Sequence, residues 1–154
     1  MSEKKKVNVP EKHLPQNPLT RQELHDTAIE RVSLISREFT DGFNFLRRYP
    51  KSVTIFGGSH FVEKDPEYKK ARSIGKRIAT DLNYSVVTGG GPGIMEAANR
   101  GAFEAGGQSL GLTIELANHQ IQNDYLTENL DFYYFFSRKV WLSFSAEAYL
   151  FFPG

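Results

Sequence analysis

The sequence contains no cysteine among its 154 residues. This absence excludes a disulfide framework, a thiolate nucleophile and a metal site built on cysteine. Histidines are few and stand far apart, without the spacing that metal ligands require. They are His13, His25, His60 and His119. We therefore expect no metal site.

An excess of charge and a long apolar run are also missing. Lysine and arginine number 19 against 18 acidic residues, a net charge of +1, which gives no electrostatic case for nucleic acid or an acidic membrane as a partner. The N-terminus lacks the apolar segment of a secretion signal, and no run approaches membrane-spanning length. Because the composition is that of an ordinary soluble globular protein, we expect a cytoplasmic location.

Glycine, in contrast, is concentrated at one point. Four glycines fall within five residues, between the β-branched run 86–88 and an alanine-rich segment: Gly89, Gly90, Gly91 and Gly93, with Pro92 among them. A strand, a tight turn and a helix start in this order build an anion site, because glycine lets backbone N–H groups approach a ligand and the helix N-terminus adds unpaired ones. A plain turn needs fewer glycines, so the pattern favours a phosphate or nucleotide site.

The chain divides into three parts. Residues 1–19 carry few apolar groups, and we expect a mobile polar tail. Residues 20–48 are expected to form an amphipathic helix, because Thr20 and Glu23 fit a capping box and apolar residues follow at steps of three and four. These are Leu24, Ala28, Val32, Ile35, Phe39, Phe43 and Leu46. Such a helix packs on a sheet or on a partner chain, and the pattern leaves both open. Residues 50–154 are expected to form a nucleotide-binding domain.

Strands alternate with helices within this domain. The expected strands cover residues 53–56, 84–88, 110–114, 130–136 and 148–152, and the expected helices begin at Pro66, after Gly93 and at Ser137. The alternation predicts the α/β class, with a Rossmann-like doubly wound parallel sheet, helices on both faces and a preceding N-terminal helix. No Gly-x-Gly-x-x-Gly follows the first strand, so a mononucleotide is favoured over NAD or FAD and no cofactor is expected.

Two further segments should border the glycine turn. Gly57, Gly58 and Ser59 follow the first strand, at the carboxyl edge where open α/β sheets bind ligands. The polar segment 118–128 lies at the same edge, and its Gln120 and Asn123 are candidates for contacts to a sugar or base. After the turn come small residues that permit close packing of their helix on the sheet: Ala97, Ala98, Gly101, Ala102 and Ala105.

Three motifs together resemble the LOG (Lonely Guy) family, the cytokinin riboside 5′-monophosphate phosphoribohydrolases also called lysine decarboxylase-like proteins. Residues 89–102 match the family's glycine motif nearly residue for residue, and residues 132–139 match the segment that bears its Arg-Lys pair. Residues 152–154 are similar to the start of its second signature, Pro-Gly-Gly-x-Gly-Thr-x-x-Glu. The resemblance covers roughly residues 50–154.

The resemblance implies hydrolysis of the N-glycosidic bond of a nucleoside 5′-monophosphate, either AMP or a cytokinin riboside monophosphate, in a homodimer without a cofactor. Arg138 would contact the phosphate or assist the departing base. Glu96 is a second catalytic candidate, on proximity alone, and can equally favour the dipole of its helix. The glycine motif with Met95, together with Lys139 and Gly154, would bind the substrate. Decarboxylation of lysine is rejected, because no lysine for a pyridoxal phosphate Schiff base is recognisable.

One departure from the family pattern is large. The sequence stops two residues into the second signature, before the glutamate that the resemblance implies carries hydrolysis together with Arg138. We therefore expect the sequence to be the N-terminal part of a longer protein. The alternative is a module that binds the phosphate of a nucleotide without catalysis.

Overall fold

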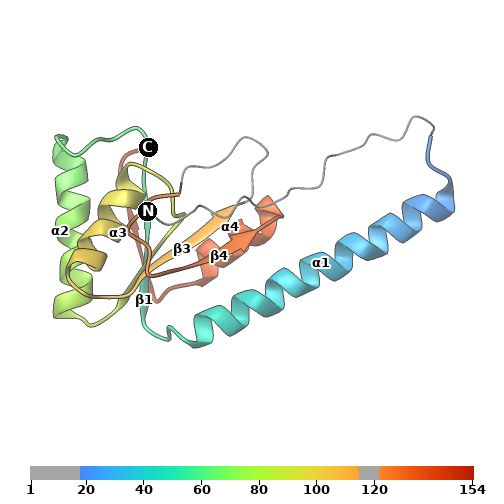
Figure 1. Cartoon of the computed structure of the whole chain (residues 1–154), viewed down its shortest axis with the longest axis horizontal. Helices are drawn as coiled ribbons and strands as arrows, with labels where there is room; N and C mark the ends of the chain where they lie inside the picture. The colour runs from blue at the N-terminus through green and yellow to red at the C-terminus, as the bar shows by residue number, and fades with distance from the viewer. Residues whose placement is uncertain (1–17, 115–121) are drawn as a thin grey trace.

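The computed structural model describes residues 18–114 and 122–154. Its elements follow in the order α1 (Arg21–Arg47), β1 (Ser52–Phe56), α2 (Pro66–Asp81), β2 (Ser85–Thr88), α3 (Ile94–Glu104), β3 (Ser109–Ile114), β4 (Glu128–Phe132), α4 (Phe135–Phe144) and β5 (Ala148–Phe151) (Figure 1). The five strands form one sheet in the order β4-β3-β2-β1-β5, and every pair is parallel. The predicted α/β, Rossmann-like fold is confirmed.

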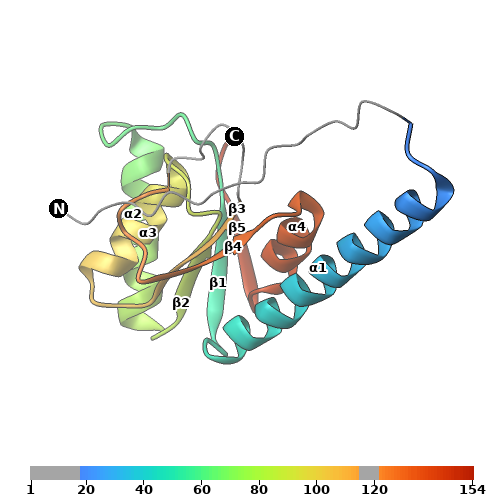
Figure 2. The same cartoon turned by 45° about the vertical axis from the view of Figure 1, so that its right-hand side comes forward.

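Helices cover both faces of this sheet. Helices α2 and α3 lie on one side, and α4 with the C-terminal part of α1 lies on the other (Figure 2). Alternation along the strands explains the division, because successive side chains point to opposite faces. On β2, Val86 packs in the cluster of α2 and α3, whereas its neighbour Val87 packs with Trp141 of α4. Both faces of the central strands are therefore buried.

The small residues of α3 serve a different contact from the one expected. Gly101 of α3 lies against the backbone carbonyl of Arg72, and Gly75 of α2 lies against that of Ala98, so that a methyl group at either glycine would collide with the other helix. The glycines thus allow close approach of α2 to α3, rather than only of α3 to the sheet. Ala97, Ala98 and Ala102 do pack in the core of that face.

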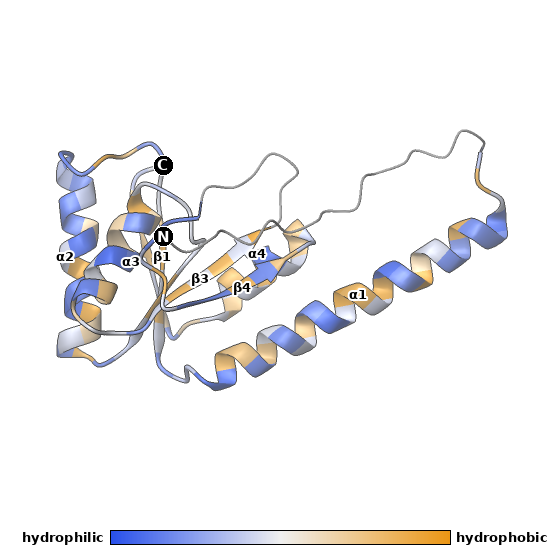
Figure 3. Cartoon of the chain, in the orientation of Figure 1, coloured by the Kyte–Doolittle hydropathy of each residue, from blue (hydrophilic) through white to orange (hydrophobic). Residues whose placement is uncertain are grey.

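Helix α1 has the expected start, because Thr20 and Glu23 form both hydrogen bonds of a capping box. Its contact face agrees with the expected stripe in part, because Phe39 and Leu46 pack against the core. Gly42 and Phe45 are the buried residues, and Phe43 is largely exposed. The N-terminal half of α1 extends away from the sheet, with apolar and polar bands along it (Figures 1 and 3). In residues 18–114 and 122–154, no helix combines the length and apolar character needed to cross a membrane.

The fourth strand and the helix after it begin earlier than expected. The predicted strand 130–136 is wrong at both ends, because β4 runs from Glu128 to Phe132, and Ser137 lies buried inside α4 instead of capping it. Ile114, the last residue of β3, pairs with Phe132 at the end of β4. Beyond this pair, Tyr133 and Tyr134 donate their N–H groups to the carboxylate of Glu38 and α4 begins, so a tertiary contact overrides the intrinsic preference of the aromatic residues for a strand.

Candidate functional site

The glycine turn after β2 and the small-residue turn after β1 meet at the carboxyl edge of the sheet. The carbonyl of Gly58 accepts a hydrogen bond from the N–H of Ile94 at 3.0 Å. A side chain at Gly93 would collide with the same carbonyl and lie 2.7 Å from Cα of Ser59, and one at Gly57 would lie 2.6 Å from Cγ2 of Ile94. The structure thus brings both predicted segments together, and their contact requires glycine.

The conformation of the glycine turn leaves donors unused. Gly90 and Gly93 both have φ of 73°, in the left-handed region that glycine enters at low cost. The N–H of Gly90 donates to the hydroxyl of Thr88 at 2.9 Å. Among the described residues, none accepts a hydrogen bond from the N–H of Gly91, Gly93 or Met95. These three donors, at the positive end of the α3 dipole, suit an anion.

A buried polar network supports this turn. Asn99 of α3 accepts a hydrogen bond from the hydroxyl of Thr88 at 2.5 Å and another from the side-chain amide of Asn123 at 3.1 Å. The same Asn123 amide donates to the carbonyl of Gly91 at 3.0 Å, and its backbone N–H donates to that of Gly90 at 2.9 Å. Both amide hydrogens of Asn123 are therefore used within the protein, so its contacts hold the turn in place. A direct contact from Asn123 to a sugar or base stays a prediction.

Asn99 was not among the predicted site residues. It is fully buried on a helix face whose other buried residues are apolar or glycine. A buried amide must be hydrogen-bonded to offset its desolvation, so a single polar residue on such a face indicates a network. That signal was present in the sequence.

Arg138 of α4 brings a positive charge to the turn from the face of the sheet that lies opposite α3. Its Nε donates to the carbonyl of Leu112 at 2.6 Å and its Nη2 donates to that of Gly89 at 3.1 Å. Within residues 18–114 and 122–154 no carboxylate forms an ion pair with this guanidinium. Burial lowers the pKa of Arg138 from its ordinary value, yet guanidinium stays protonated at neutral pH. A half-buried cation held only by carbonyls retains its attraction for an anion.

Met95 lies beside the same glycine, near the position that its Cβ would take. A side chain at Gly89 would meet both the guanidinium of Arg138 and the Met95 sulfur, the latter at 2.9 Å. Gly89, Met95 and Arg138 are thus brought together, as the sequence predicted. Pro92 lies half-buried inside the turn.

Glu96 faces away from this group, toward α2. Its carboxylate accepts a hydrogen bond from the hydroxyl of Tyr68 at 2.7 Å. Burial of the phenol, and then this hydrogen bond, raise the pKa of Tyr68 to about 12. The described contacts of Glu96 and Arg138 share no residue. The catalytic part expected of Glu96 stays a prediction.

Three predicted residues make no described contact with the glycine turn: Lys139, Gly154 and Gln120. Lys139 is exposed, with its ammonium 4.7 Å from the ring centre of Phe135. Gly154 is exposed and follows Pro153, whose carbonyl accepts the N–H of Gly58 at 2.9 Å. Gln120 lies outside the described residues.

A carboxylate that sequence reasoning missed lies on the neighbouring strands. Asp131 of β4 accepts a hydrogen bond from the hydroxyl of Thr113 on β3. The methyl group of Thr113 occupies the space beside Gly90, where an added side chain would come within 2.5 Å of it. Asp131 comes near the turn because β4 pairs with β3 in a register that places it opposite Thr113, and the sequence alone does not predict this register.

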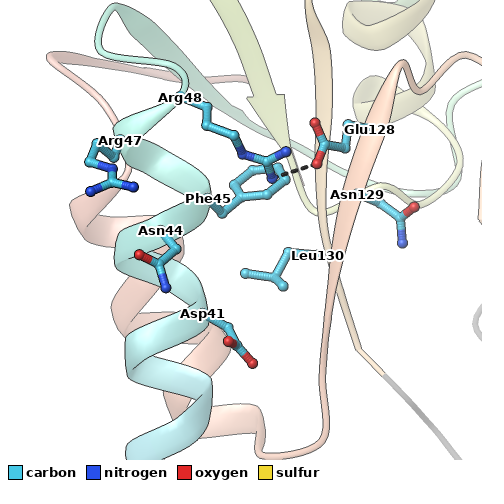
Figure 4. A pocket seen from close by; sticks show the side chains of 8 residues that line it. All are labelled: Asp41, Asn44, Phe45, Arg47, Arg48, Glu128, Asn129 and Leu130. Carbon is cyan, nitrogen blue, oxygen red and sulfur yellow. Dashed lines mark ion pairs between the residues drawn. The ribbon is translucent and has the colours of Figure 1, made fainter.

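A hollow of about 420 Å³ lies at the opposite edge of the sheet from the glycine turn. It is lined by the end of α1 and the start of β4, and an ion pair of 2.5 Å between Arg48 and Glu128 crosses it (Figure 4). None of the predicted site residues lines this hollow. In the part of the chain that the structure describes, no group of three or more His, Asp or Glu side chains is placed to hold a metal ion.

Comparisons with known proteins identify the relatives of this chain. The model of the SLOG cluster4 family matches residues 50–132. The structural genomics target TM1055 is 28% identical, with a TM-score of 0.57 over 68% of this chain and 61% of its own. A molybdenum cofactor (Moco) carrier protein from Chlamydomonas reinhardtii is 22% identical, with a TM-score of 0.56 over 68% and 62%.

A molybdenum cofactor binding protein from Rippkaea orientalis is 20% identical, with a TM-score of 0.57 over 68% of this chain and 63% of its own. At 20% and 22% identity, these two likenesses concern the fold alone. The chain matches less than two thirds of the length of each of the three structures. No curated protein matches the sequence.

Proposed function

The chain belongs to the SLOG cluster4 family, and from this premise we propose that it is a nucleoside 5′-monophosphate phosphoribohydrolase of the cytoplasm. The reaction would hydrolyse the N-glycosidic bond of AMP or of a cytokinin riboside monophosphate, giving the free base and ribose 5-phosphate. One observation carries the proposal: the guanidinium of Arg138 reaches Gly89 beside three turn N–H groups that no described residue accepts.

The phosphate would bind first to these groups. A dianion gains from the unused N–H donors of Gly91, Gly93 and Met95 and from the charge of Arg138. Glycine is needed at the turn because the phosphate oxygens must come within hydrogen-bond distance of the backbone. The network of Asn99 and Asn123 would hold the donors in place before the ligand arrives, so that little ordering is needed on binding.

The bond cleavage asks for a carboxylate. As the bond from C1′ to the base nitrogen breaks, its electron pair leaves with the base and positive charge develops on the sugar ring. A water oxygen then bonds to C1′ and loses a proton to a carboxylate, and the departing base nitrogen gains a proton, so that the free base and ribose 5-phosphate result. Arg138 cannot take that proton, because its guanidinium stays protonated. Among the described residues, Glu96 is the carboxylate that we assign to this step, on the basis of its place in the first turn of α3, and it would have to leave its hydrogen bond with Tyr68 to act there.

A binding module without catalysis is the second candidate. The contact of Glu96 with Tyr68 favours it, because a carboxylate that already accepts a phenol hydrogen bond is held away from the turn. The Moco carrier protein from Chlamydomonas reinhardtii and the molybdenum cofactor binding protein from Rippkaea orientalis share this fold.

One experiment separates the two functions. The purified protein is titrated with AMP and with N6-prenyl-AMP by calorimetry, and the same mixtures are then analysed for free base by chromatography. Binding with release of base supports the hydrolase, and binding without release supports the module. Absence of binding to either nucleotide contradicts both.

We extend the proposal to a homodimer formed through α1, which the family resemblance also implies. The half of α1 beyond the sheet exposes apolar side chains, with Leu24 53% and Val32 61% exposed. An exposed apolar stripe on a helix gains from contact with a second apolar surface. Light scattering after size exclusion should give twice the chain mass, and Val32→Glu should give the single mass.

A further inference from the structure

Helix α4 does not cap its own N-terminus. Its N-cap residue, Tyr134, makes no side-chain hydrogen bond to the helix, and the first turn contains no acidic residue. The first N–H groups of a helix have no partner within it, and they need an acceptor from elsewhere when they are buried. At the start of α4, a carboxylate from a distant part of the chain accepts the N–H of the N-cap residue Tyr134 and of Tyr133 just before it.

The acceptor is Glu38 of α1. Its Oε1 accepts hydrogen bonds from the N–H of Tyr133 at 2.5 Å and of Tyr134 at 3.1 Å. A carboxylate at a helix N-terminus is favoured by the dipole, and its hydrogen bonds from N–H groups are stronger than neutral ones. Oε2 of the same carboxylate is buried without a hydrogen-bond partner among the described residues. A half-satisfied buried carboxylate is costly, so its placement depends on the start of α4.

The turn that Glu38 holds is the turn that carries Arg138. The N–H of Arg138 donates to the carbonyl of Tyr134 at 3.2 Å, the first turn of α4. From there its side chain reaches the carbonyls of Leu112 and Gly89. A second contact one turn along α1 fixes the same helix, where Gly42 lies directly against the indole of Trp141. The position of the guanidinium is thus tied to α1 at two points.

We propose that Glu38 is a positioning residue for Arg138. By accepting the N–H groups of Tyr133 and Tyr134 it sets where α4 begins, and so it keeps the guanidinium beside the glycine turn. The part of the proposal that concerns ligand binding rests on the proposed function. The part that concerns the position of Arg138 does not depend on any ligand.

The first test needs no ligand. Phenylglyoxal modifies accessible arginines, and peptide mass spectrometry gives the modification rate of Arg138 alone. Glu38→Ala should raise this rate about fivefold to tenfold, the change expected from losing a helix cap. Glu38→Gln keeps an acceptor oxygen and should restore most of the protection. Glu30→Ala is the matched control on the exposed surface of α1, with the same loss of charge and gain of helix propensity, and should leave the rate unchanged.

The second test is calorimetry with AMP on the same variants. Glu38→Ala should weaken binding about fivefold to tenfold, Glu38→Gln should bind nearly as wild type does, and Glu30→Ala should bind as wild type does. An unchanged Arg138 modification rate in Glu38→Ala overturns the proposal. A raised rate with unchanged AMP affinity overturns its functional part and leaves Glu38 a structural cap. If wild type itself binds no AMP, the proposed function fails, and the modification rates still decide whether Glu38 positions Arg138.

Discussion

Replacing Arg138 by alanine removes the one positively charged side chain that, among the described residues, donates a hydrogen bond to the glycine turn. The guanidinium donates to two carbonyls, at 2.6 and 3.1 Å, and is paired with no described carboxylate. Its loss therefore costs the protein two hydrogen bonds and costs an anionic ligand its cation. The two costs are separable, because only the second one depends on the ligand's charge.

The loss of AMP affinity can be estimated from the hydrogen bond between the phosphate and the charged guanidinium. Hydrogen bonds to charged groups contribute about 1.5–3 kcal/mol, and the lower end applies here because Arg138 is half-buried and water screens it. We expect AMP to bind about 10- to 30-fold more weakly to Arg138→Ala. Adenosine lacks the phosphate, so its affinity should stay the same. The loss of two internal hydrogen bonds should lower the melting temperature by about 2–4 °C.

The assay is calorimetric titration of wild type and variant with AMP and with adenosine. Lys139→Ala is the control, because it removes the same charge from the adjacent residue, whose ammonium lies over Phe135 instead of at the turn. It should leave AMP binding within about twofold. Equal AMP affinities for Arg138→Ala and wild type, or equal losses in the two variants, would refute the assignment of Arg138 to the phosphate site.

Three further predictions concern the stability of the fold around the turn. Gly93→Ala should cost more than about 3 kcal/mol by urea unfolding, whereas Gly106→Ala, with φ of 74° and open space around it, should cost only about 1 kcal/mol. Equal costs would contradict the tight contact between the turns. Asn99→Leu should cost about 2–3 kcal/mol and weaken AMP binding, because it leaves the Asn123 amide buried and short of an acceptor; an unchanged urea midpoint would contradict the network. Because the pKa of Tyr68 is raised to about 12, the neutral phenol stabilises the fold below pH 10, and this contribution is lost as pH rises from 10 to 12. Urea midpoints should fall between pH 10 and 12 in wild type and much less in Tyr68→Phe. Equal falls in the two proteins would contradict the raised pKa of Tyr68.

The parts of the fold that follow from local patterns were predictable from the sequence. The capping box of Thr20 and Glu23 forms as expected, because both partners lie within one helical turn. The glycine turn and the turn after β1 also lie at one edge, because parallel strands place their carboxyl ends together. Gly90 and Gly93 adopt the positive φ that the dense glycines suggested.

Contacts between distant segments were not predictable in this way. The aromatic run after β4 has the local preference of a strand, and its helix depends on Glu38, which is 95 residues from Tyr133. The apolar stripe of α1 contains Phe43, which stays largely exposed, whereas Gly42 is buried directly against the indole of Trp141 on α4. Periodicity gives a helix and its apolar side, and packing decides which residues of that side are covered.

The same distinction applies to the site. Asn123 is predicted to contact a ligand because it is polar and close to the turn in the expected topology. The sequence does not predict that its amide is directed to Gly91 and Asn99, because that geometry depends on how α3 packs against β3. Asp131 and Glu38 come to the site only through strand register and helix packing.

The central claim is that the glycine turn with Arg138 binds the phosphate of a nucleotide. Titrating ¹⁵N-labelled protein with AMP, and separately with adenosine, tests it most directly. If the turn binds phosphate, AMP, and not adenosine, should produce the largest amide shifts at Gly91, Gly93 and Met95, with a shift of the Arg138 side-chain Nε–H. Shifts that are the same for both ligands, or that centre on the hollow beside Arg48 and Glu128, would contradict it.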